Sequence, residues 1–181
     1  LIQSSLLRQV AEVAPRTAPA LVFTEIPGER VAAFDAALTG AFGVPLTTDN
    51  YLRAPFATGR ISQIKGKPVV TSQIAASERW AYDNDISLSA IGAEPPAAGI
   101  VEGAWWAADY AGPPLLAMEV DVAKAGNLKL GDSVTLSVLG RDIEAKVAVL
   151  RKVDFGGFGA SFPLVLDPAG DDVPNGVETA Y

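Results

Sequence analysis

An alternation of apolar and polar residues between positions 127 and 153 constrains the fold of this chain most strongly. In residues 134–138, Val, Leu and Val alternate with Thr and Ser, which is the two-residue repeat of a half-buried strand. A Leu-Gly-Arg-Asp corner at residues 139–142 precedes a second alternating run at residues 143–149, where charged residues of both signs separate the apolar ones. The pattern therefore predicts a β-hairpin whose apolar face must lie against another part of the protein.

The other segments predict both helices and strands. Helical patterns occupy residues 2–14, 28–38 and 120–125, the last closed by Gly126. Extended patterns occupy residues 20–26, 51–63, 86–91 and 162–166, and loops are expected at residues 40–50, 92–99 and 167–176. A strand, a tight corner and a helix at residues 20–38 form half of a βαβ unit. That corner lacks the glycine spacing of a phosphate-binding loop, so no nucleotide site is expected.

Composition excludes several functional classes. The chain contains no His and no Cys, which removes Ser-His-Asp catalysis, thiolate chemistry, disulfides and nearly all zinc ligand sets. Its formal net charge of -7 argues against a nucleic-acid partner, because phosphate binding needs clustered Lys and Arg. We therefore expect no metal, no cofactor and no nucleic acid.

The sequence is expected to be a piece of a longer protein. It begins with Leu1, and a strand pattern starts near its last residues, 178–181. No apolar run has the length of a membrane span, and no signal peptide is visible. The mean hydropathy of +0.25 is high for a free-standing domain, which favours a unit that packs on other parts of an assembly.

The most conspicuous cluster of candidate functional residues contains Trp105, Trp106, Asp109 and Tyr110. Neighbouring aromatic rings beside a carboxylate can form a shelf that stacks a sugar or a lipid. The simpler alternative is that one tryptophan fills the core and the other covers a loop. In a strand, consecutive side chains point to opposite faces, so only one of the two tryptophans would face a given pocket.

Carboxylates offer a second set of candidates for acid–base chemistry: Glu102, Asp109, Glu119 and Asp121. Nothing in their spacing brings two of them together, and a solvated surface is the better explanation for them. Asp132 follows a glycine at the start of the hairpin, where a carboxylate that accepts backbone N–H bonds stabilises a turn. The glycine-rich residues 154–161 are interpreted as a hinge between lobes or as a ligand lid.

An ordered series of motifs resembles the first extracytoplasmic domain of FtsX/MacB-like ABC-transporter permease subunits, and especially the YbbP-like branch. The series runs over residues 100–168, and a weaker likeness covers the amino-terminal part. The residues that carry it are Gly103, Trp105, Trp106, Asp109, Tyr110, the Gly-Pro-Pro at 112–114, the Leu-x-Leu-Gly-Asp at 128–132 and the Leu-Gly-Arg at 139–141. The sequence departs from the family pattern with Thr-Glu at 24–25 and Asp-Phe at 154–155.

The resemblance implies an α+β fold with two lobes. A small α/β lobe that contains a βαβ unit would comprise residues 1–83 and 154–181, with residues 2–14 as a stalk helix. A mostly β lobe, residues 84–153, would be inserted into it, as in MacB-like periplasmic domains.

The resemblance also implies a function. The domain would lie on the periplasmic side of the bacterial inner membrane, as a non-catalytic part of a permease that exports or releases hydrophobic or lipid-like compounds. A cytoplasmic ABC ATPase subunit would act through the parent permease, and a periplasmic lipid-active hydrolase or another periplasmic protein is a candidate partner. Two alternatives stay open: a stand-alone carbohydrate- or lipid-binding module that uses residues 105–110, and a carboxylate-dependent hydrolase.

Overall fold

The protein has an α+β fold, as the sequence predicts. The computed structural model describes residues 21–47, 50–51, 53–92, 94–95, 99–153, 162–169 and 177–180. The first half contains β1 (Phe23–Pro27), η1 (Gly28–Arg30), α2 (Val31–Phe42), β2 (Arg53–Pro55), β3 (Ala57–Ile64), β4 (Lys67–Pro68), η2 (Thr71–Gln73), α3 (Trp80–Asp83) and β5 (Ile86–Ala90). The second half contains β6 (Ile100–Gly103), β7 (Leu115–Glu119), α4 (Val120–Ala125), β8 (Ser133–Val138), β9 (Arg141–Arg151), β10 (Leu164–Leu166) and β11 (Val177–Ala180).

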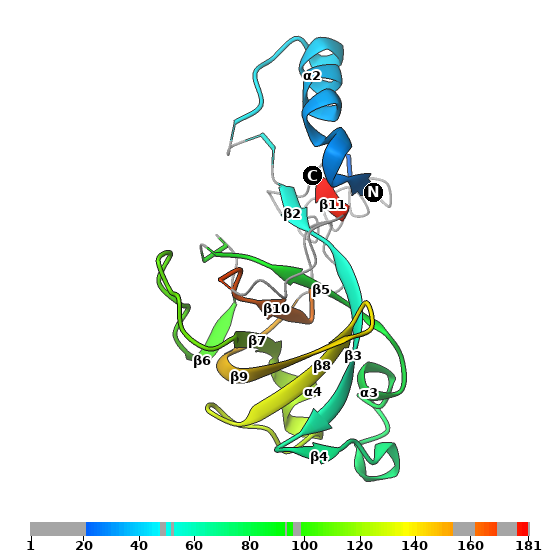
Figure 1. Cartoon of the computed structure of the whole chain (residues 1–181), viewed down its shortest axis with the longest axis vertical. Helices are drawn as coiled ribbons and strands as arrows, with labels where there is room; N and C mark the ends of the chain where they lie inside the picture. The colour runs from blue at the N-terminus through cyan, green and yellow to red at the C-terminus, as the bar shows by residue number, and fades with distance from the viewer. Residues whose placement is uncertain are drawn as a thin grey trace, which may run out of the picture.

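Six strands close into a mixed barrel. Going round the ring, β3 pairs with β5, β5 with β10, β10 with β7, β7 with β9, β9 with β8, and β8 with β3. The β5–β10 and β7–β9 pairs are parallel, and the other four are antiparallel. Strands β4 and β6 extend the ring at β3 and β9, and α3 and α4 lie beside the barrel in Figure 1.

The predicted hairpin is confirmed as β8 and β9. Its two-residue corner, Leu139 and Gly140, has backbone φ angles of 49° and 81°, which is the left-handed geometry that two-residue hairpin turns require. Every second residue of β8 is buried, and the same alternation holds in the first part of β9. The apolar face of the hairpin thus lines the barrel interior, which explains the alternation in the sequence.

The helix predicted at residues 120–125 is also confirmed as α4. The carboxylate of Glu119 caps it by accepting hydrogen bonds from the backbone N–H groups of Asp121 and Val122. Its last turn ends at Gly126, and the hydroxyl of Tyr82 in α3 donates to the carbonyl of Val122 at 2.7 Å. This bond fixes α3 against α4.

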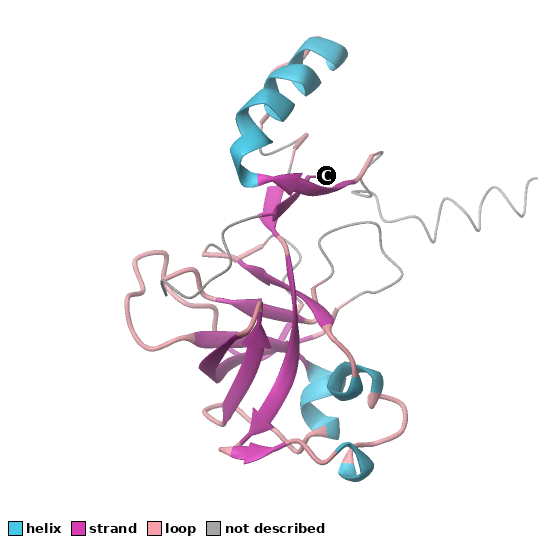
Figure 2. Ribbon diagram, turned by 45° about the vertical axis from the view of Figure 1, so that its right-hand side comes forward, coloured by secondary structure: helices cyan, strands magenta, loops and turns pink. Residues whose placement is uncertain are grey.

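A second, three-stranded sheet lies beside the barrel. It consists of β1, β11 and β2 in that order, all antiparallel, so strands from both ends of the described chain meet in it. Helix α2 projects from this sheet, away from the barrel, in both views (Figures 1 and 2). The helix is longer than the sequence predicts: it runs into the expected loop at residues 40–50 and ends at Gly43, whose φ of 68° is left-handed.

Polar contacts hold α2 to this sheet. The Asp35 carboxylate accepts a hydrogen bond of 2.6 Å from the Tyr51 hydroxyl and forms a 2.9 Å ion pair with Arg53 of β2. Burial, together with the bond to Asp35, raises the pKa of the Tyr51 hydroxyl to about 12. At the base of the helix, the rings of Phe23 and Phe34 meet edge to face with centroids 5.1 Å apart.

Buried apolar side chains form two clusters. The larger fills the barrel and the space under α3 and α4, with Leu88, Leu116, Met118, Leu136 and Leu164 among its most buried members. The smaller cluster contains Ala54 of β2 together with Trp106, Ala117, Val149, Phe162 and Val165. Because Ala54 belongs to this cluster, β2 packs on the outside of the barrel as well as pairing within its own sheet.

The described residues do not show two lobes divided after residues 83 and 153. Strands β3 and β10 come from the segments predicted to form the first lobe, yet both are hydrogen-bonded inside the same ring as β5, β7 and β8. The predicted boundary thus passes through the barrel, because alternation along a strand does not reveal which strand pairs with it. The predicted stalk helix at residues 2–14 and the predicted hinge at residues 154–161 lie outside the described residues.

Gly103 provides a test of this strand arrangement. Its φ is 87°, and a Cβ placed on it would lie 2.1 Å from the carbonyl oxygen of Ala148 in β9. We expect Gly103→Ala to lower the free energy of unfolding by about 2–4 kcal/mol, because both strain and backbone displacement follow. Urea denaturation measures this change. The matched control is Gly40→Ala in α2, where nothing beyond the chain neighbours and the backbone of the helix itself lies within 4 Å of the new Cβ. We expect this variant to be more stable by about 0.5–1 kcal/mol. Equal effects at the two positions would contradict the β6–β9 pairing.

Candidate functional site

The two tryptophans of the predicted aromatic cluster pack on the same side of the barrel. Residues 104–107 form neither helix nor strand, so the alternation of side chains along a strand does not apply to them. Trp106 is buried in the smaller core cluster, and Trp105 is half-buried against it. Their ring centroids are 4.5 Å apart with an interplanar angle of 35°.

Both indole N–H groups have protein partners. The Trp106 indole donates to the carbonyl of Ile91 at 2.9 Å, and the Trp105 indole donates to the carbonyl of Gly92 at 3.2 Å. These bonds hold the segment after β5 against the tryptophan pair. In this arrangement Trp106 fills the core and Trp105 covers a loop, which is the simpler of the two interpretations of the sequence.

The other two residues of the cluster differ in exposure. The Tyr110 hydroxyl donates to the carbonyl of Pro113 at 2.6 Å, and its ring packs against the smaller core cluster. That bond closes the turn that contains Gly112, where an added Cβ would lie 2.4 Å from the tyrosine hydroxyl. Asp109 is exposed. The structure thus gives three of the four predicted residues a packing role and leaves one carboxylate at the surface.

The carboxylates considered for acid–base chemistry have different environments. Glu119 is buried and bonded to the backbone at the start of α4, while Asp121 is exposed and forms an ion pair of 3.3 Å with Lys124. Glu102 lies on β6 and is exposed, like Asp109. Among the residues that the structure describes, no group of three metal-ligating side chains comes together.

Glu119 has a buried charged neighbour that the sequence pattern does not indicate. Arg151 is directly opposite Glu119 in the parallel β7–β9 pair, and each residue is about 5% exposed or less. The Arg151 guanidinium donates to the carbonyl of Phe162 at 3.3 Å. Burial lowers the pKa of Arg151, and the charge of Glu119 opposes that shift. Burying either charge alone would be strongly unfavourable, and the opposite charge beside it reduces that cost.

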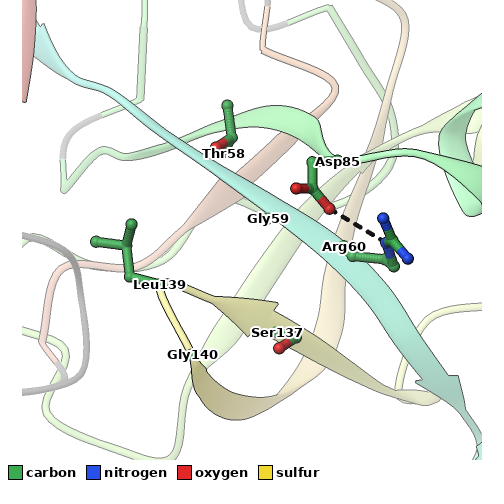
Figure 3. A pocket seen from close by; sticks show the side chains of 7 residues that line it. All are labelled: Thr58, Gly59, Arg60, Asp85, Ser137, Leu139 and Gly140. Atoms are coloured by element: carbon green, nitrogen blue, oxygen red, sulfur yellow. Dashed lines mark hydrogen bonds and ion pairs between the residues drawn. The ribbon is translucent and has the colours of Figure 1, made fainter.

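A shallow depression with a volume of about 360 Å³ lies on the barrel surface. Figure 3 shows the residues that line it: Thr58, Gly59, Arg60, Asp85, Ser137, Leu139 and Gly140. Arg60 and Asp85 form an ion pair of 3.1 Å at its edge, with both side chains more than half exposed. Apart from Leu139 and two glycines, the lining side chains are polar, and a solvated ion pair of this kind contributes little binding energy.

The helices and the comparisons with known proteins give three negative findings. Within the part of the chain that the structure describes, no helix has both the length and the apolar character needed to cross a bilayer. No protein-family model matches this sequence, and a comparison with curated proteins gives no match. The resemblance to FtsX/MacB-like permease domains therefore rests on the motifs quoted above.

The packing role of the tryptophans can be measured with three single variants. We expect Trp106→Ala to lower the free energy of unfolding by about 3–5 kcal/mol, because a buried indole leaves a cavity. Trp105→Ala, at a half-buried ring, should lower it by about 1–2 kcal/mol. The matched control is Trp80→Ala, at a tryptophan that is 40% exposed, with an expected loss below about 1 kcal/mol. If Trp106→Ala left stability unchanged and removed binding of a sugar or lipid probe, the packing role would be refuted.

Asp132 gives the hairpin a pH dependence. Its carboxylate accepts the Lys129 backbone N–H at 2.8 Å and lies 3.2 Å from the Lys65 ammonium, which confirms the predicted turn role. The bond from Lys129, followed by the interaction with Lys65, holds the pKa of Asp132 below its ordinary value of 3.8. A depressed carboxyl pKa stabilises the folded state above the unfolded pKa, and this contribution disappears as the pH falls through the folded value.

We therefore expect Asp132→Asn to be less stable than the unmodified protein at neutral pH, by less than about 1 kcal/mol because the group is partly exposed. The difference should shrink as the pH falls below 3.8. Urea midpoints of the two proteins, measured side by side from neutral to acidic pH, test this. A difference that stayed constant over that interval would show that the charge of Asp132 plays no part.

Proposed function

We propose that this chain is a non-catalytic extracytoplasmic domain of an FtsX/MacB-like ABC-transporter permease. In this role it relays a conformational change, driven by ATP hydrolysis on a cytoplasmic ATPase subunit, to a substrate or partner on the periplasmic side of the inner membrane. The ATPase would act through the parent permease and not touch this domain. No cofactor and no catalytic residue belong to the proposal.

The observation that carries the proposal is the sheet shared by β1, β2 and β11. The chain runs from β2 directly into β3 of the barrel, and β11 follows the last barrel strand, β10. A barrel whose flanking strands pair with one another has the connectivity of one unit inserted into another, as the family resemblance implies. We infer that the first unit comprises β1, α2, β2 and β11, and that the inserted unit is the barrel from β3 to β10.

A relay of this kind requires bodies that move without deforming. The closed ring supplies one, because each of its six strands is hydrogen-bonded on both sides and its interior is filled with apolar side chains. The contacts of Asp35 with Tyr51 and Arg53 fasten α2 to β2, so that force applied to the helix would reach the shared sheet. The two units are joined covalently between β2 and β3 and between β10 and β11, and Ala54 of β2 also packs in the smaller core cluster of the barrel.

A hydrophobic or lipid-like compound is the proposed substrate class, and a periplasmic lipid-active hydrolase or another periplasmic protein is the proposed partner. These proposals rest on the resemblance. The alternative, a stand-alone carbohydrate- or lipid-binding module built on residues 105–110, is less well supported. Both indole N–H groups there are bonded to backbone carbonyls, and the rings pack on the core.

Spin labels can test the relay, since these 181 residues contain no native cysteine and any cysteine elsewhere in the parent protein can be replaced by serine. In the parent protein, reconstituted with its ATPase, one pair of labels joins Phe42→Cys on α2 to Val70→Cys beside the barrel, both exposed positions. The control pair, Val70→Cys with Leu139→Cys, lies within the barrel unit. We expect trapping with ATP and vanadate to change the distance distribution of the first pair and leave the control pair unchanged.

Two results would contradict the proposal. One is a parent protein that fractionates as a freely diffusing protein without an associated ATPase. The other is turnover of an ester or glycoside substrate that vanishes on Glu102→Gln or Asp109→Asn, which would favour the hydrolase.

A further inference from the structure

Four exposed lysines gather at one end of the barrel. The turn between β3 and β4 carries Lys65 and Lys67, while Lys124 lies in α4 and Lys129 in the turn that follows it. We call these four residues the lysine cluster. In Figure 1, β4 lies at the end of the long axis opposite to α2, so the cluster faces away from the sheet of β1, β2 and β11.

Contacts between the two turns bring the lysines together. The ammonium group of Lys65 donates to the carbonyl of Asn127 at 2.6 Å and lies 3.2 Å from the carboxylate of Asp132. Lys67 pairs with Ile64 of β3, and β3 pairs in turn with β8. Two strand spacings, about 10 Å, therefore separate Lys67 from the start of β8. The cluster thus forms one continuous surface that a single ligand can span.

Carboxylates neutralise only half of the positive charge on this surface. Asp121 and Asp132 form ion pairs with two of the lysines. Among the residues that the structure describes, the other two lysines, Lys67 and Lys129, form no ion pair. The surface therefore has two more positive than negative charges, in a chain whose formal net charge is -7.

This distribution of charge suits a short acidic segment better than a large anionic surface. A short segment meets only the lysines, whereas a membrane or a nucleic-acid duplex would also meet the negative charge of the rest of the chain. The tips of the two turns, residues 65–68 and Asn127, contain no aromatic, Leu, Ile or Val residue that could enter a bilayer. We propose that the lysine cluster is a docking surface for a short acidic segment of a partner protein.

This docking surface goes beyond the proposed function and does not depend on it, because its evidence is the distribution of charge. A partner bound there would leave α2 and the sheet of β1, β2 and β11 uncovered (Figure 1). Exposed charges are screened by salt, so the affinity should be low and should fall as the salt concentration rises.

An NMR titration of the whole chain tests the proposal, with an oligo-glutamate peptide of about ten residues as the probe. In low salt we expect the amide signals of residues 64–68 and 124–132 to shift on addition of the peptide. Raising the salt concentration from about 0.01 to 0.15 M should reverse most of these shifts. An oligo-lysine peptide of the same length should leave these residues unchanged.

Two double variants with the same change in charge locate the binding surface. Lys67→Glu/Lys129→Glu should raise the dissociation constant of the oligo-glutamate peptide on the order of tenfold or more. Both side chains are exposed, so the urea midpoint should show that this variant still folds. The control Arg30→Glu/Lys152→Glu changes two exposed residues outside the cluster and should leave the constant unchanged, within about twofold.

Four outcomes would overturn the proposal. The first is the absence of binding in low salt, and the second is binding that the lysine variant does not weaken. The third is a shift of the same residues with vesicles of equal parts phosphatidylcholine and phosphatidylglycerol but not with the peptide, which would assign the cluster to a membrane. The fourth is a shift of these residues when the concentration of the chain alone is raised, which would assign it to a second copy.

Discussion

Closure of the barrel depends on β3, which must pair closely with one strand on each side. At Gly59, β3 pairs simultaneously with Ile86 of β5 and Val138 of β8, which closes the ring. A side chain there has no space: a Cβ would lie 2.8 Å from the side chains of Leu88 and Val138. Glycine at this position lets the two neighbouring strands approach, and the interior behind it is filled by the larger apolar cluster.

The closed ring determines where the tryptophans and the flanking strands can pack. The barrel is closed, so the tryptophans of the predicted aromatic shelf pack on its outer side. Trp106 is buried in the smaller core cluster, and Trp105 lies beside it against a loop. The strands on either side of the barrel, β2 and β11, are paired with one another. The chain therefore enters and leaves the barrel at neighbouring strands. A closed barrel held in this way can move as one unit, which is what the proposed relay requires.

Local features of the fold follow from the sequence, and long-range pairing does not. The alternation at residues 134–149 reports which side chains face the core, so the hairpin, α4 with Gly126, and the turn at Asp132 were predictable. The choice of neighbours for β3 depends on contacts between residues far apart in the chain, which periodicity does not encode. The predicted boundary after residue 83 therefore fell between β3 and its partner β5.

The candidate site shows the same limit. The tryptophans stood out by composition, yet their orientation depended on a segment that is neither helix nor strand, so the rule for alternating strand residues did not apply. The buried pair of Glu119 and Arg151 looked like any other surface charges in the sequence. One signal could have indicated this pair: each of the two apolar strands ends in a charged residue.

Native-state hydrogen exchange tests the central claim, a closed barrel inserted between strands that share their own sheet. If the claim is correct, the amides of β3, β5, β7, β8, β9 and β10 exchange together, with the protection of global unfolding. The amides of β1, β2 and β11 should form a second group with lower protection. The account would be contradicted if residues 84–153 exchanged as one unit while β3 and β10 exchanged separately from them.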